Sequence, residues 1–284
     1  MRALPALLAL ALVPSVAAAG GKKTAKTEAK GNTGPAAKAP SACGVKILPL
    51  AEGNQWTYSS VAAPLPAEDA IKRIAPQPAK TVVITVKSIE AKKGADTVVT
   101  LEEKITIDLT KDEKKPVLDE RTVTTTITCS DKKFDVSPES FFFAGEPGGY
   151  LGMKLDKVER TKGTSWQLTK GGIGDAEWRE DLAINWSRTP TEGSSAKPGA
   201  GKLELERRFT PQQPEQIITK LGSYHAEKLG LVTTGRVTLD VPEAKPSELP
   251  ANWLTTMWLA DGVGVVQSLN SYAHMYQLTD AVLK

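Results

Sequence analysis

The stretch that decides the fold is TVVITVKSIEAKKGADTVVTLEEKITIDL, residues 81–109. Its first part alternates Val82, Ile84 and Val86 with residues that are mostly more polar, and its second part alternates in the same way. On that second part the apolar face holds Val99, Leu101, Ile105, Ile107 and Leu109. A period of two indicates half-buried strands, and the KKGAD turn at residues 92–96 predicts that they form one long hairpin.

The same period continues through the rest of the chain. Runs with this pattern span residues 122–129, 177–186, 202–209, 224–241 and 263–278; the fourth is expected to hold two strands, and the last a hairpin around Asn270 and Ser271. Short helices are expected only at residues 66–74 and 214–220. Strands with one polar face and hairpin turns are typical of antiparallel sheets with a single buried face. The sequence therefore predicts an all-β antiparallel fold, either a twisted sandwich or an open, cradle-like half-barrel.

The number of domains stays open at this stage. GNQWTY at residues 53–58 and GTSWQL at residues 163–168 each place a glycine, a polar pair and a tryptophan at the start of a strand run. Two tandem halves, near residues 43–150 and 151–284, would give this echo, and so would a common way of entering a strand. The body from residue 43 onward is long enough for one large β domain or two smaller ones.

The first 19 residues have the features of a secretory signal peptide. Arg2 supplies a positive n-region, residues 3–13 form an apolar run, and Ala17 and Ala19 place small residues where a signal peptidase would cleave, before Gly20. The apolar run is too short to span the roughly 30 Å of a bilayer core. We expect an exported protein, periplasmic or extracellular, with no transmembrane segment.

The segment that follows, residues 20–42, is rich in Lys, Ala, Gly, Thr and Pro and contains no aromatic residue. Such a composition predicts a disordered tether. Residues 1–42 carry six of the chain's 36 Lys and Arg residues and one of its 33 Asp and Glu residues, which leaves residues 43–284 with 30 basic and 32 acidic ones. This nearly neutral body argues against a nucleic-acid-binding protein.

The chain has two cysteines, Cys43 and Cys129. In an exported protein two cysteines favour a disulfide, and the alternation of residues 122–129 points Cys129 toward the core. One alternative is a two-cysteine metal site, which lacks nearby histidines. Another is lipid attachment at Cys43, but Pro40 occupies the position where a lipid-attachment box has an aliphatic residue. We expect the disulfide.

No motif in the chain identifies a reaction. A G-x-S-x-G nucleophile elbow is absent, and neither DGVGVV (residues 261–266) nor GGIGD (residues 171–175) precedes a helix, as a dinucleotide-binding loop would. His225 and His274 lie in strand patterns and are expected on a sheet face rather than on a metal. We expect no catalytic residue, no metal and no cofactor. A hydrolase with paired carboxylates stays open, because such pairs have no spacing signature.

Phe141, Phe142 and Phe143 form a run of three aromatic residues. If the segment is extended, three consecutive side chains cannot all face one core, and one of them is then free to line an apolar groove. The alternative is a buried corner between sheets.

Three phrases resemble a broad group of secreted bacterial β proteins. That group begins its body with a P-L-x-x-G-N-x-W-x-Y strand, later carries a G-x-[FY]-x-A-x-[KR] strand, and ends with a W-[FY]-A-x-G-V-G-x-V hairpin. The matching residues here are Pro49, Leu50, Gly53, Asn54, Trp56 and Tyr58; Gly222, Tyr224, Ala226 and Lys228; and Trp258, Ala260, Gly262, Val263, Gly264 and Val266. The match covers the two ends of the body and departs at Leu259, where the group often has an aromatic residue, and at Asp261, where it often has proline. The resemblance implies an extracytoplasmic antiparallel β fold, likened to curved sheets that cradle lipids, and it implies no catalytic residues.

The residues of these phrases also fit an architectural role. Trp56, Tyr58 and Trp258 would each bury a large area against neighbouring strands, and Gly262 and Gly264 permit a turn or a bulge. The sequence thus favours a non-enzymatic exported envelope protein that binds a partner or an apolar ligand on a sheet face. The alternatives are an envelope polysaccharide hydrolase and a purely structural envelope component.

Overall fold

The computed structural model describes residues 31–38, 41–64, 77–91, 95–130, 133–148, 153–169, 172–188, 198–240 and 247–284. Residues 31–284 form one compact unit. The expected signal peptide, residues 20–30 of the expected tether and the helix expected at residues 66–74 lie outside the described residues. Within the ranges that the structure describes, no helix has the length and apolar character needed to cross a membrane.

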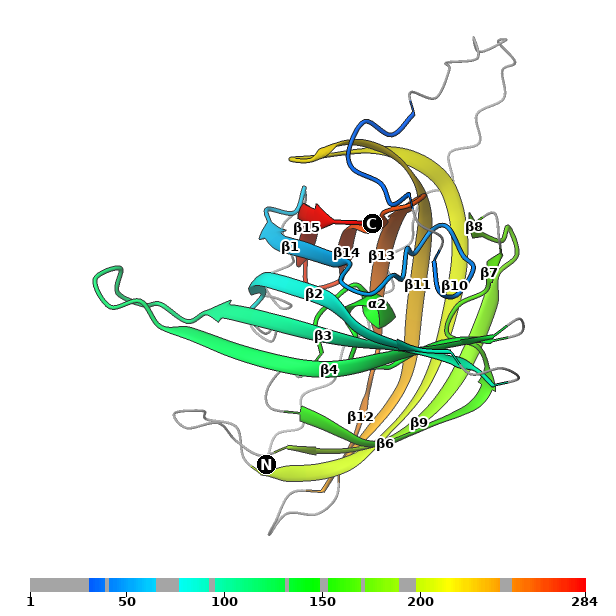
Figure 1. The fold of residues 1–284 in the computed structure, drawn as a ribbon. Helices are drawn as coiled ribbons and strands as arrows, with labels where there is room; N and C mark the ends of the chain where they lie inside the picture. The colour runs from blue at the N-terminus through cyan, green and yellow to red at the C-terminus, as the bar shows by residue number, and fades with distance from the viewer. Residues whose placement is uncertain are drawn as a thin grey trace, which may run out of the picture. The chain divides into compact units, whose positions relative to one another are not determined.

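The fold is all-β with barely any helix, and it is built on one large open antiparallel sheet of 13 strands (Figure 1). Two further strands, β7 and β8, pair with each other, and α2 (Phe141–Ala144) is a single helical turn. The strands are β1 (Gln55–Val61), β2 (Ala79–Glu90), β3 (Thr97–Asp108), β4 (Leu118–Ser130), β5 (Lys133–Val136), β6 (Met153–Gly163), β7 (Leu168–Thr169), β8 (Gly172–Ile173), β9 (Trp178–Arg188), β10 (Gly199–Thr219), β11 (Gly222–Asp240), β12 (Ser247–Pro250), β13 (Trp253–Ala260), β14 (Gly264–Asn270) and β15 (Met275–Val282).

In the large sheet the strands lie in the order β5-β4-β3-β2-β1-β15-β14-β13-β11-β10-β9-β6, and β12 pairs with β11. The first and last strands of the body meet inside the sheet, because β1 pairs with β15 and Gln55 lies opposite Val282. Strands from before and after residue 150 lie in this one sheet and meet where β1 pairs with β15. Since the described strands form one large sheet, the open alternative holds and the sandwich does not.

The long hairpin expected from residues 81–109 is confirmed. β2 pairs antiparallel with β3, and buried and less buried residues alternate along most of both strands, as a period of two predicts. The expected final hairpin is also confirmed, since β14 ends at Asn270 and pairs antiparallel with β15. Local alternation was therefore sufficient to find these strands.

Two expectations about secondary structure are wrong. Residues 214–219, expected within a helix, belong to β10, because pairing with β11 (Ile217 lies opposite Tyr224) overrides the local preference. Residues 224–240, expected as two strands, lie in β11 alone. Gly235 lies inside β11 and does not interrupt it. At this position the neighbouring strand comes so close that a Cβ atom would lie 2.0 Å from the Glu204 carbonyl oxygen, and only glycine permits that approach.

The three phenylalanines form a helical turn rather than an extended segment. Ser140 caps α2, since its hydroxyl accepts a hydrogen bond from the Phe142 N–H, and Gly145 ends the helix in the left-handed region with φ of 65°. Consecutive side chains of a helix point in different directions, so each ring has its own neighbours. All three rings are buried. Of the two alternatives that the sequence left open, the one in which a ring lines an open apolar groove therefore does not hold.

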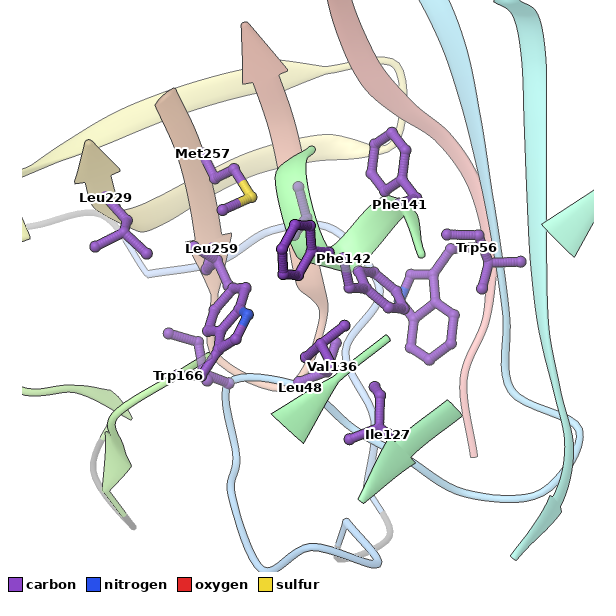
Figure 2. Close-up of a cluster of buried hydrophobic side chains, with 14 of the residues drawn as sticks. Leu48, Trp56, Ile127, Val136, Phe141, Phe142, Trp166, Leu229, Met257 and Leu259 are labelled. Atoms are coloured by element: carbon purple, nitrogen blue, oxygen red, sulfur yellow. The ribbon is translucent and has the colours of Figure 1, made fainter. Parts of the chain in front are cut away.

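Helix α2 packs against the buried face of the sheet. Phe141 stacks on Tyr58 with ring centroids 4.4 Å apart, and Phe142 packs edge-on against Trp56 at 5.4 Å. In Figure 2, Phe142 lies between Trp56 and the β13 side chain of Met257. The chain's own helix therefore occupies this part of the sheet's inner face.

Cys43 and Cys129 form the expected disulfide, with their Cα atoms 5.8 Å apart. The bond joins the segment before β1 to the end of β4, across 86 residues of sequence. Such a bond is consistent with export, because oxidising compartments favour disulfides.

Residues 31–38, which we call the strap, are bound to the body rather than disordered. The Thr33 N–H donates to the Ser223 carbonyl at 2.9 Å, and the Ala37 N–H donates to the Gly262 carbonyl at 2.7 Å. This part of the tether expected at residues 20–42 is therefore hydrogen-bonded to the body. Composition could not reveal the contact, because the strap is held by hydrogen bonds of its backbone and of the Asn32 and Thr33 side chains, and not by apolar side chains.

Candidate functional site

The aromatic residues of β1 hold the turn between β13 and β14. Trp56 Nε1 donates to the Val263 carbonyl at 2.5 Å, and the Tyr58 hydroxyl donates to the Val265 carbonyl at 2.8 Å. Both aromatic side chains are fully buried. Their polar atoms are thus used within the fold.

The two glycines expected at a turn or bulge lie at the turn between β13 and β14, with Gly264 as the first residue of β14. Gly262 and Gly264 have φ of 70° and 97°, a region that favours glycine. The register of β13 against β14 also shifts between Trp258 and Leu259. A Cβ atom on Gly264 would lie 3.1 Å from Leu48 Cδ1, so the close approach there also favours glycine.

Trp258 lies on the other face of β13 from Met257, since successive strand residues alternate. Its Nε1 donates to a Glu215 carboxylate oxygen at 2.9 Å. Lys228 Nζ lies 2.6 Å from the same carboxylate and 5.4 Å from the Trp258 ring centroid. Trp258 is therefore a buried residue that also anchors the distal part of the β10–β11 hairpin.

A pocket of about 650 Å³ opens where four segments meet: the strap, the end of β8, the bulge in β10 and the end of β13 against β11. This volume suits a small molecule. The ionisable residues that line the pocket are Asp175, His225, Glu227, Lys228 and Asp261. None of the sequence's candidate site residues lies in this set.

Glu227 is the half-buried acid in this pocket. Its carboxylate accepts the Ile173 N–H at 2.7 Å, so β8 fixes its position. Burial raises the pKa of Glu227, the charges of Asp261 and Asp175 raise it further, and the Ile173 hydrogen bond and His225 oppose them. The carboxylates are thus near enough to repel one another.

The charge of the pocket is negative on balance. Lys228 is already paired with Glu215, at 2.6 Å, and the same pocket is lined by three acidic residues, Asp175, Glu227 and Asp261. Over the described part of the chain, no group of three or more His, Cys, Asp or Glu side chains is arranged to hold a metal ion.

Sequence reasoning missed Glu227, although one signal was present. Glu227 is in phase with Leu229 and Leu231, which are both buried, so the alternation of β11 places an acid on an apolar face. Asp261 carried no such signal, because it lies in a turn whose position depends on pairing between distant strands.

The histidines differ from each other. His225 lies on β11 and lines the pocket, as a sheet-face residue. His274 lies in the turn before β15 and not in a strand, so the expectation of a sheet face is wrong for it. It is buried, with Nδ1 2.9 Å from a Glu146 carboxylate oxygen.

A second acid, Glu103 on β3, is fully buried beneath α2. Its carboxylate accepts hydrogen bonds from the Ser140 hydroxyl at 2.6 Å, the Thr125 hydroxyl at 2.9 Å and the Phe141 N–H at 2.9 Å. Burial raises the pKa of Glu103 to about 7 from 4.5; these hydrogen bonds oppose the shift and Glu139 adds to it.

Glu103 should make stability fall as pH rises. Its pKa is higher in the folded protein than in the unfolded chain, so the folded state binds the proton more tightly. The folded state is destabilised progressively between about pH 4.5 and 7, by about 3 kcal/mol in total. In Glu103→Gln this dependence is absent. Urea unfolding of both proteins from pH 4.5 to 8 measures the difference, and a difference that stays constant with pH would contradict the prediction.

Comparison with known proteins finds likeness of fold only. No family model matches the chain, and no curated protein matches it. One similar solved structure is an inferred exported protein with a YmcC-like fold from Bacteroides fragilis, at 12% identity and a TM-score of 0.42, with 87% of this chain and 100% of that chain covered. Another is an inferred lipoprotein from Parabacteroides distasonis, at 11% identity and a TM-score of 0.43, with 84% and 99% covered.

Proposed function

We propose that the protein is an exported, non-enzymatic binding protein whose ligand site is the pocket beside Glu227. The observation that carries the proposal is the gathering of three carboxylates, those of Asp175, Glu227 and Asp261, around one pocket of about 650 Å³. Repulsion among them costs free energy in the empty pocket, and a bound cation would remove that cost. Export is supported by the features of residues 1–19 and by the disulfide.

The ligand that this lining favours is a small, positively charged molecule with hydroxyl groups. The side chains of Gln212 and Gln213 add carboxamides to the pocket, and these can both donate and accept hydrogen bonds. Pro211 and Pro214 flank them at the bulge in β10. A sugar that carries an amino group has this chemistry.

An apolar ligand is less well supported than a polar one. The phenylalanines that the sequence offered for an apolar groove are buried in α2, against the sheet. The pocket beside Glu227, in contrast, has charged and amide side chains in its lining, next to the apolar Ile173 and Leu259. We therefore replace the expected apolar ligand by a cationic one.

Binding should depend on the charge of Glu227. The deacetylated form of chitobiose carries amino groups, whereas its N,N′-diacetyl form is neutral, so the two disaccharides separate charge from shape. We expect the wild-type protein to bind the cationic form more tightly, and Glu227→Gln to weaken this binding about tenfold, the equivalent of about 1.4 kcal/mol. Isothermal titration calorimetry at low ionic strength measures both affinities.

The matched control is Glu206→Gln, which removes a carboxylate on β10 that does not line the pocket. We expect this variant to bind like the wild type. Equal binding of the two disaccharides, or equal effects of the two substitutions, would contradict the proposal.

One observation favours a second function. A carboxyl group with a raised pKa beside other carboxylates is the arrangement of a general acid in a glycoside hydrolase, and Glu227 fits that description. Release of reducing ends from envelope polysaccharide distinguishes the two functions. Release that is lost in Glu227→Gln would establish the hydrolase and overturn the non-enzymatic proposal, whereas no release by the wild type supports binding alone.

A further inference from the structure

A second pocket, of about 520 Å³, is lined by the strap, by the segment before β1 and by the turn that joins β13 to β14. Asp261 belongs to the linings of both pockets, whereas Glu227 lines only the first. The volume of the second pocket also suits a small molecule. The cation proposed for the first pocket makes no use of it.

Hydrogen bonds hold the walls of the second pocket in place. The Ala37 N–H donates to the Gly262 carbonyl at 2.7 Å, and the Gly262 N–H donates to the Lys46 carbonyl at 3.0 Å, so the three segments are joined to one another. Within the segment before β1, the Ser41 hydroxyl donates to the Leu48 carbonyl at 2.8 Å. The pocket is therefore formed before a ligand binds, which reduces the entropy lost on binding.

The charge of the second pocket is positive on balance, opposite to that of the first. Lys38 and Lys46 are its basic lining residues, and Asp261 is its acidic one. Both lysines are exposed, and within the described ranges neither ammonium group forms an ion pair with an acidic side chain. The charge of Asp261, in contrast, acts on Glu227, whose pKa it raises. Since lysine side chains are long and flexible, both ammonium groups are free to turn toward a bound anion.

The rest of the lining is mostly small and apolar, and it includes Ala36, Ala37, Val45 and Pro49. These side chains can pack against the carbon atoms of a ligand. Gly44 leaves additional room, because a Cβ atom there would have no neighbour within 4 Å. The pocket thus combines two cations with an apolar wall, which suits an anion that carries an organic part.

We propose that the second pocket binds a small organic phosphate, with Lys38 and Lys46 at the phosphate group and the apolar wall against the carbon part. Lysine commonly binds phosphate as a point charge. A phosphate group on an organic molecule carries about −1.5 to −2 charges at pH 7, which two lysines balance. The site is separate from that of the cation, because the charges of the two linings are opposite.

Glucose 6-phosphate and glucose test the proposal, because they differ in the phosphate group and neither carries the amino group that the first pocket favours. We expect the protein to bind glucose 6-phosphate at least about tenfold more tightly than glucose, as measured by isothermal titration calorimetry at low ionic strength. Lys38→Gln combined with Lys46→Gln should weaken the binding of glucose 6-phosphate about tenfold. These substitutions should not disturb the walls, because backbone groups of both lysines make the hydrogen bonds there.

The matched control is Lys111→Gln combined with Lys114→Gln, which removes the same charge from exposed residues outside the pocket. This control and Glu227→Gln should both bind glucose 6-phosphate as tightly as the wild type, so the two sites can fail separately. Equal binding of glucose and glucose 6-phosphate, or equal losses in the two lysine pairs, would overturn the proposal. Weaker binding in Glu227→Gln would place the ligand in the first pocket and would also overturn it. Inorganic phosphate that binds as tightly as glucose 6-phosphate would overturn the assignment to an organic phosphate, because the apolar wall would then contribute nothing.

Discussion

Replacing Glu180 with leucine should lower the free energy of unfolding by about 3–5 kcal/mol, the usual cost of leaving a buried charge without its partner. Glu180 is fully buried on β9 and accepts hydrogen bonds from Arg207 at 2.7 Å and from Arg160 at 2.6 Å. Burial lowers the pKa of Arg207 to about 10, and Glu180 opposes this by stabilising the charge. Without Glu180, the Arg207 guanidinium keeps the Phe143 carbonyl but loses its counter-charge.

Urea unfolding measures this loss. The matched control is Asp181→Ala on the same strand, where the side chain pairs with Lys162 near the surface and should contribute no more than about 1 kcal/mol. A double variant, Glu180→Leu with Arg207→Met, should recover much of the stability because no charge of that pair remains. If Glu180→Leu cost no more than Asp181→Ala, the buried ion pair would not be structural.

Removing the disulfide should lower the free energy of unfolding by about as much as Glu180→Leu does. The bond between Cys43 and Cys129 closes a loop of 86 residues. This loop limits the conformations of the unfolded chain, and the entropy that the unfolded chain thereby loses stabilises the fold by at most about 4–5 kcal/mol. The variant with Cys43→Ala and Cys129→Ala should therefore unfold at a much lower urea concentration. The segment before β1 would also lose its tie to β4.

Unfolding of the wild type with and without reductant provides the control for that variant. Reductant should destabilise the wild type by the same amount as the double substitution and should leave the variant unchanged. A loss below about 1 kcal/mol would contradict the prediction, and it would mean that the unfolded chain is already compact.

The alternation of apolar and polar residues predicted the strands, but it did not predict which side chains of neighbouring strands contact each other. The period of two placed Glu180 in phase with Trp178 and Leu182, and so on the buried face, but it could not reveal the arginines that neutralise it. Arg160 comes from β6 and Arg207 from β10, on opposite sides of β9. Their meeting depends on strand order, which sequence alternation does not contain.

The sequence-based predictions failed for segments whose structure depends on contacts with distant parts of the chain. Residues 214–219 join β10 because β11 pairs with them, and the strap is ordered because an edge of β11 is free to bind it. The helical turn of α2 is supported by Glu103, whose carboxylate accepts the Phe141 N–H from across the core. The pocket combines four such segments, so only the unusual position of Glu227 was open to prediction.

The binding of a cation beside Glu227 is tested most directly by NMR titration of the labelled protein with deacetylated chitobiose. The Ile173 amide is the sharpest probe, because its N–H donates to Glu227 at 2.7 Å. We predict that the largest shifts fall on the amides of Ile173, His225 and Asp261, and that in Glu227→Gln they reach their half-maximum only at about tenfold higher ligand concentration. Shifts confined to other parts of the sheet, or none at a saturating ligand concentration, would contradict the assignment of this pocket as the binding site.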